Sequence, residues 1–75
     1  MTRTTRPLDY QVGGAHYKDY AIQPIEYGMA NNLDICQANV VKYVTRFRQK
    51  GGLDDLRKAK HYLELLATFE YEDDL

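Results

Sequence analysis

Apolar residues recur at helical spacing over two long stretches of the chain, and a pair of glycines separates these stretches. Both sets are spaced three or four positions apart: Cys36, Val40, Val44 and Phe47 before the glycines, and Leu56, Ala59, Leu63 and Leu66 after them. Residues at this spacing lie on one side of an α-helix. The pattern therefore predicts two long helices joined by a tight turn at Gly51 and Gly52.

The first of these helices has clear start and stop signals. Asp34, followed three residues later by Gln37, matches a capping box, so the helix should begin at Ile35. One of the two glycines can adopt the left-handed conformation that often ends a helix. We therefore expect this central helix to run to Arg48 or Gln49.

The final helix is predicted to begin at Leu53 or Asp54 and to end at Phe69 or Glu70. Asp54 and Asp55 are well placed in its first turn, where the helix dipole is positive. Its apolar arc extends around the helix to Phe69 and is wider than one neighbouring helix can cover. Because a chain of 75 residues has a small single core, worth about 3–5 kcal/mol, we expect the protein to be a homo-oligomer.

A shorter helix is predicted ahead of this hairpin. Pro24 suits a first helical position, and Asn31 and Asn32 are typical of a helix end. Residues 1–12 lack sustained periodicity and are interpreted as a flexible N-terminal arm, and residues 71–75 as an acidic tail. The expected fold is all-α, with one domain over residues 13–70: a short helix, then a two-long-helix hairpin, assembling as a homo-oligomeric helical bundle.

Composition and charge exclude several classes of protein. A hydrophobic content of 44% favours a folded chain, and a net charge of −1 argues against a nucleic-acid partner held by bulk charge. The single cysteine, Cys36, excludes an internal disulfide and falls on the apolar stripe, where we expect it to be buried. No apolar run approaches the roughly 18 residues of a membrane span, so no membrane partner is expected.

Polar side chains on the two long helices converge on the glycine turn, which also adjoins most of the lysines and arginines. On the central helix, one set shares an arc of roughly 100°: Asn39, Lys42, Tyr43 and Arg46. On the final helix, a second set forms a polar edge: Asp55, Lys58 and Tyr62. Lys50 lies beside the turn that joins the two helices. Arg and Lys bind phosphate, and a tyrosine ring can contact a base. The convergence predicts a nucleotide-binding site.

A second glycine pair lies near the N-terminus. Gly13 and Gly14 precede His16 and Tyr17, and backbone N–H groups at such a pair can bind a phosphate. Without a following Lys and Ser or Thr, the segment is not a P-loop. These four residues are candidate ligand contacts, and a plain turn is the alternative.

Each candidate on the long helices also has a structural alternative. Lys42 and Arg46 would equally suit a solvated helix face, and Asp55 could neutralise the helix dipole or pair with Arg46. Tyr43 and Tyr62 have the character of residues at the edge of a core. No histidine or cysteine spacing predicts a metal site. No catalytic residue can be assigned from the spacing.

Three segments carry a long compound pattern: VGGAHYK, IQPIEYGMANNLD and NVVKYVTRFRQKGGLDDLRKAKHYL. Over residues 12–66 they resemble the small tailed-phage proteins described as nucleotide kinase-like. The resemblance implies a phage protein of the host cytoplasm that binds a nucleotide. If it is an enzyme, the resemblance implies a deoxynucleoside monophosphate kinase without a P-loop, using Mg²⁺. Four alternatives to an enzyme remain. The first two are an anti-defence sponge that sequesters a signalling nucleotide without chemistry and an inhibitor that binds a host protein. The others are a nucleic-acid binder, which the near-neutral charge disfavours, and a purely structural oligomer.

Overall fold

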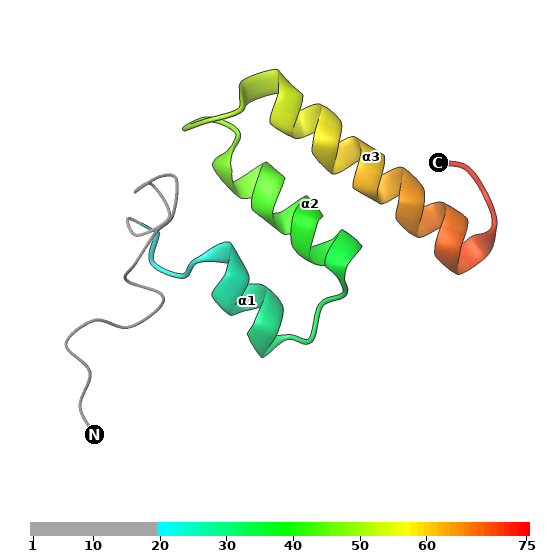
Figure 1. The fold of residues 1–75 in the computed structure, drawn as a ribbon, viewed down its shortest axis with the longest axis horizontal. Helices are drawn as coiled ribbons and strands as arrows, with labels where there is room; N and C mark the ends of the chain where they lie inside the picture. The colour runs from blue at the N-terminus through cyan, green and yellow to red at the C-terminus, as the bar shows by residue number, and fades with distance from the viewer. Residues whose placement is uncertain (1–19) are drawn as a thin grey trace.

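The computed structural model describes residues 20–75 and arranges them as three α-helices lying side by side, with α2 between α1 and α3 (Figure 1). The helices are α1 (Pro24–Ala30), α2 (Ile35–Arg46) and α3 (Gly52–Tyr71). No strand occurs within residues 20–75, so the predicted all-α class and the hairpin of two long helices are confirmed there. The predicted arm over residues 1–12 lies outside the described residues, and the homo-oligomer stays a prediction.

Helix α1 begins and ends as the sequence predicts. Pro24 is its first residue, and the backbone N–H of Gln23 donates to the Glu26 carboxylate over 3.1 Å. Asn31 caps the other end, where its side-chain amide donates to the Tyr27 carbonyl over 3.0 Å. The helix is only seven residues long. Helices this short are marginal alone, so α1 depends on its packing against α2.

The start of α2 is confirmed and its predicted end is wrong. The Gln37 N–H donates to Asp34 Oδ1 over 2.8 Å, and the Asp34 N–H donates to Gln37 Oε1 over 3.0 Å, which completes the capping box. The helix ends at Arg46, not at Arg48 or Gln49. The Gly52 N–H donates to the Phe47 carbonyl, five residues back, over 2.7 Å, so the backbone leaves the regular helical pattern after Arg46.

The glycine turn leads directly into α3. Gly52 has a φ of +53°, so one glycine is left-handed as predicted, but it is already the first residue of α3. The helix therefore starts one residue before Leu53 and ends at Tyr71, one residue beyond the predicted limit. Glu72 ends the helix, which the sequence did not predict, because it adopts a left-handed φ of +55° and donates its N–H to the Thr68 carbonyl.

Small residues occupy the most buried positions between the helices. Among the described residues, the buried apolar side chains are Ala59, Pro24 and, as predicted, Cys36. Gly28 of α1 is also buried, and a Cβ there would stand 3.7 Å from the Ala38 Cβ of α2. Close packing by small residues leaves larger apolar side chains on the outside, such as Leu63, which is 42% exposed. None of the three helices is long and apolar enough to cross a membrane.

Candidate anion site at the turn between α2 and α3

A buried ion pair holds the turn between α2 and α3. Asp55, in the first turn of α3, is fully buried. Its carboxylate accepts from Arg46 Nε over 3.0 Å and from Arg46 Nη2 over 3.1 Å, and also from the Gly51 N–H over 3.0 Å. This two-pronged contact is the strongest geometry between guanidinium and carboxylate. Of the two alternatives raised for Asp55, the structure shows the pairing with Arg46, together with its place at the positive end of α3.

Gly51 is required at its position by the approach of that carboxylate. A Cβ built on Gly51 would overlap the carboxylate carbon and both carboxylate oxygens of Asp55. The backbone of Gly51 has a φ of −93°, which other residues adopt readily. Space, and not backbone conformation, therefore makes glycine necessary here.

The Arg46 guanidinium holds the pKa of Asp55 below its ordinary value of 3.8, chiefly through their hydrogen bonds, and burial opposes this effect. Because the native pKa is lower than the unfolded one, the pair contributes stability above the unfolded pKa. That contribution is lost as the pH falls through the native pKa. We expect the urea midpoint of the wild type to fall more steeply below pH 4 than that of Asp55→Asn. Parallel pH profiles for the two proteins would contradict this linkage, and Asp54→Asn serves as the control for general acid sensitivity.

A cluster of cations surrounds the ring of Tyr43 next to the ion pair. Lys42 Nζ lies 4.6 Å from the ring centroid, Arg46 Cζ 4.8 Å and Lys58 Nζ 5.4 Å. The ring of Tyr62 stacks beside Tyr43, with centroids 6.1 Å apart and an angle of 16° between the planes. Helix α2 thus supplies one tyrosine and two cations, and α3 supplies the other tyrosine and the third cation. We call these five residues the tyrosine cluster.

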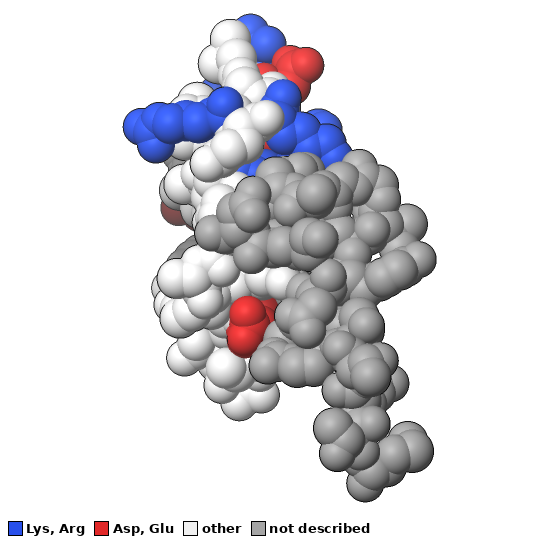
Figure 2. Space-filling model, turned by 90° about the vertical axis from the view of Figure 1, so that its left-hand side faces the viewer, with Lys and Arg blue, Asp and Glu red and all other residues white. Residues whose placement is uncertain are grey.

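The tyrosine cluster carries more positive charge than its carboxylate neutralises. Asp55 is bonded to Arg46, and neither Lys42 nor Lys58 forms an ion pair with a carboxylate in the described part of the chain. Two positive charges thus remain beside a stacked aromatic pair. In the face shown in Figure 2, Lys and Arg gather at the end of the molecule that carries the α2–α3 turn. The arrangement can attract an anion, and its rings can stack on a planar group.

The structure brings together most of the candidate residues predicted on the long helices. Asn39 is half-buried on α2, one turn before Tyr43, and Lys50 is exposed within the turn. Within residues 20–75, neither of them is among the side chains that lie over or stack on the Tyr43 ring. Asp55 is enclosed, and residues 20–75 contain no group of three or more His, Cys, Asp or Glu side chains able to hold a metal ion. Gly13, Gly14, His16 and Tyr17 lie outside the described residues.

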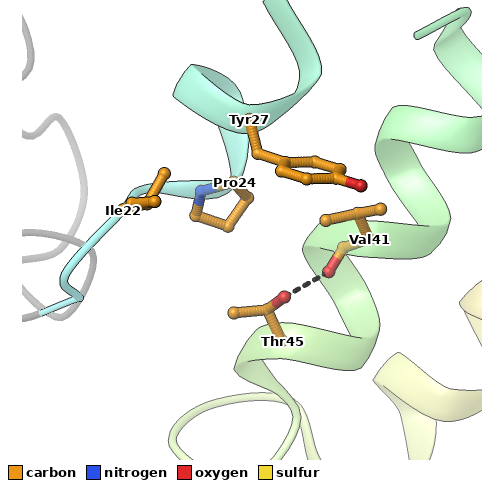
Figure 3. Close-up of a pocket in the computed structure, with 5 residues that line it drawn as sticks. All are labelled: Ile22, Pro24, Tyr27, Val41 and Thr45. Atoms are coloured by element: carbon orange, nitrogen blue, oxygen red, sulfur yellow. Dashed lines mark hydrogen bonds between the residues drawn. The ribbon is translucent and has the colours of Figure 1, made fainter. Parts of the chain in front are cut away.

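A groove between α1 and α2 was not predicted from the sequence. Its lining residues come from the segment before α1, from α1 itself and from the side of α2 that faces α1: Ile22, Pro24, Tyr27, Val41 and Thr45 (Figure 3). The Tyr27 ring extends from α1 over Val41, and the Thr45 hydroxyl donates to the Val41 carbonyl over 2.6 Å. Val41 and Thr45 are four residues apart and so lie on one side of α2, the side that contacts α1. Two residues are a weaker sequence signal than the four-residue apolar stripe that includes Cys36.

The described residues thus form a small helical protein with a cationic, aromatic cluster at the turn of a helical hairpin. The chain belongs to the DUF3310 family, a family of proteins of unknown function, whose family model matches residues 9–64. That match covers the predicted glycine pair at Gly13 and Gly14, the whole of α1 and α2, and the tyrosine cluster. None of the curated proteins and none of the solved structures that were compared matches the chain.

Proposed function

We propose that this protein binds a nucleotide at the tyrosine cluster, as its resemblance to the nucleotide kinase-like phage proteins implies. The observation that supports the proposal is the set of three cations around the Tyr43 ring, two of them without a carboxylate partner in residues 20–75. A nucleotide joins a phosphate to a planar base. The cluster offers ammonium groups for the first and a tyrosine pair for the second.

The geometry divides the roles within the cluster. Lys42 and Lys58 are proposed to bind the phosphate, and the half-buried rings of Tyr43 and Tyr62 are proposed to stack with the base. The Arg46 side chain is 14% exposed and forms a two-pronged contact with Asp55. Its proposed role is therefore to hold the rings and add positive potential. Direct phosphate binding by Arg46, predicted from the sequence, would compete with that pair.

Binding without chemistry is the version of this function that the site supports best. Phosphoryl transfer needs a metal that bridges phosphate oxygens and a carboxylate that holds it. Asp55, the carboxylate next to the cluster, is fully buried and bonded to Arg46 and Gly51. This observation favours a nucleotide sponge, including one that takes up a signalling nucleotide of host defence, over a kinase acting with Mg²⁺.

Isothermal calorimetry with a panel of mono-, di- and cyclic nucleotides tests the proposal. We expect one class of nucleotide to bind, and Lys58→Gln to weaken its affinity by about 1.5–3 kcal/mol, the scale of a hydrogen bond to a charged group. Lys42→Gln should have a similar effect. Lys60→Gln is the matched control, because Lys60 is an exposed lysine on the same helix as Lys58 and is not part of the tyrosine cluster.

Two results would count against the proposal. The absence of heat and of any thermal shift with every nucleotide in the panel would reject nucleotide binding altogether. Equal affinities for wild type and for the folded Lys42→Gln and Lys58→Gln variants would place the nucleotide elsewhere. Release of a phosphoryl product with Mg²⁺ and ATP would replace the sponge by the kinase.

A further inference from the structure

The three helices leave one broad apolar face without a covering layer. It is defined by six residues that continue from one helix to the next: Tyr27 of α1, Val40 and Val44 of α2, and Leu56, Leu63 and Leu66 of α3. A first groove is lined by Tyr27, Val40, Leu63 and Leu66. A second groove shares Leu63 and Leu66 with it and continues toward the end of α3. Val44 and Leu56 extend this apolar face toward the turn by helical spacing.

Four of the six residues of the apolar face are more than a third exposed in a single copy of the chain. Val44 is 48% exposed and Leu63 42% exposed, whereas Cys36 and Ala59, in the core, are 6% and 4% exposed. Stable domains enclose their core between two layers of secondary structure. A core this small is worth only about 3–5 kcal/mol, so burial of this face would add substantially to the stability of the fold. A second copy of the chain can provide that burial wherever the protein is present.

The charges along the apolar face identify that partner more closely. At the end near the turn, Arg48 follows Val44 by four residues and Lys60 follows Leu56 by four, so both cations border the face. At the opposite end, Asp34 and Glu70 line the second groove. The sequence extends this polarity, because residues 35–50 contain no acidic side chain and residues 61–75 contain no Lys or Arg.

A surface that is positive at one end, apolar in the middle and negative at the other is complementary to itself when turned end for end. We propose that the apolar face binds a second copy of this chain in an antiparallel arrangement with two-fold symmetry. The turn of each copy then lies over the acidic end of the other, and α2 and α3 of both copies form a four-helix bundle. Arg48 of one copy faces Glu70 of the other in this arrangement.

The dimer surface and the proposed nucleotide site use different residues. Lys42 and Lys58 line neither groove of the apolar face, so a dimer-surface variant that stays folded keeps the cations of the tyrosine cluster. Calorimetry with nucleotides and sedimentation of the free protein therefore report on the two proposals separately.

Sedimentation equilibrium of the full chain tests the assembly, and a charge exchange tests its direction. We expect the wild type to have twice the mass of the 8.7 kDa chain at tens of micromolar. Arg48→Glu and Glu70→Lys should each weaken dimerisation at least fivefold, because each places like charges together at two symmetric positions. The double variant should recover most of the wild-type affinity. Glu64→Lys, on an exposed position outside both grooves, is the matched control for charge and should leave the affinity unchanged.

A wild type that sediments at 8.7 kDa while folded would overturn the proposal and make a different protein the occupant of the apolar face, as the inhibitor hypothesis requires. A dimer in which the double variant is no tighter than the single variants would overturn the antiparallel arrangement. Val44→Lys gives a second measurement, because it should abolish the dimer, observed either as a monomer or as loss of helical circular dichroism. A folded dimer of Val44→Lys with wild-type affinity would reject the apolar face as the interface.

Discussion

Replacing Asp55 with alanine is expected to lower the free energy of unfolding by about 3–5 kcal/mol, the usual effect of removing one partner from a buried ion pair. The Arg46 guanidinium would lose both of its contacts with Asp55, and the Gly51 N–H would lose its acceptor. For a protein of this size that loss is comparable with the whole stability of the fold. Circular dichroism during urea titration should therefore show a variant that is largely unfolded at 25 °C.

Asp54→Ala is the matched control for this experiment. Asp54 is the neighbouring carboxylate in the same turn of α3, but it is exposed and pairs with the equally exposed Arg57 over 3.2 Å. Exposed pairs contribute about 0.2–1 kcal/mol, so this variant should remain folded. If Asp54→Ala and Asp55→Ala proved equally stable, the buried pair would not be what holds the turn.

Substitution of Gly51 by alanine should destabilise the protein by about 2–3 kcal/mol, within the range for overpacking a closed site. The added methyl group would overlap the Asp55 carboxylate and force the ion pair to move. Thermal unfolding followed by circular dichroism measures the change. Gly52→Ala is the natural comparison, because its Cβ would meet nothing within 4 Å and its cost, about 1–2 kcal/mol, comes only from a φ of +53°.

A double-variant cycle distinguishes steric overlap from a general effect on the turn. Residues in direct contact are non-additive in such cycles, so Gly51→Ala should cost far less when Asp55 is already alanine, which lacks the overlapping carboxylate atoms. The cycle is measured in a stabilising osmolyte, which keeps the Asp55 variants folded. The cost of Gly52→Ala should be the same in both backgrounds. A Gly51→Ala variant as stable as the wild type would show that the carboxylate can leave this position freely.

The sequence predicted those parts of the fold that depend on neighbouring residues. The start of α2 follows from Asp34 and Gln37, which are three positions apart and form a hydrogen-bonded box without help from the rest of the chain. The end of α2 at Arg46 was missed, since it depends on the turn that brings the chain back to Asp55. The end of α3 was missed because Glu72 is not a residue type that is typical of the left-handed conformation.

The candidate site shows the same division. The convergence of Lys42, Tyr43 and Lys58 was predicted from two helical faces and a short turn, and the structure brings these residues together. Whether Arg46 points at a ligand or at Asp55 remained open, because the spacing allows both and only the packed turn decides between them. The need for glycine at position 51 is likewise a three-dimensional fact, since it arises from a carboxylate four residues further along the chain.

The ion pair at the turn also bears on the order in which the chain folds. Arg46 and Asp55 are nine residues apart, so bringing them together closes a short loop at a small entropic cost. Contacts this local form early, and helical proteins dominated by them fold within microseconds to milliseconds. We expect the hairpin of α2 and α3 to be the folding nucleus, with α1 docking afterwards. The contacts around Tyr43 would then begin to form within a single chain, before α1 packs against the hairpin.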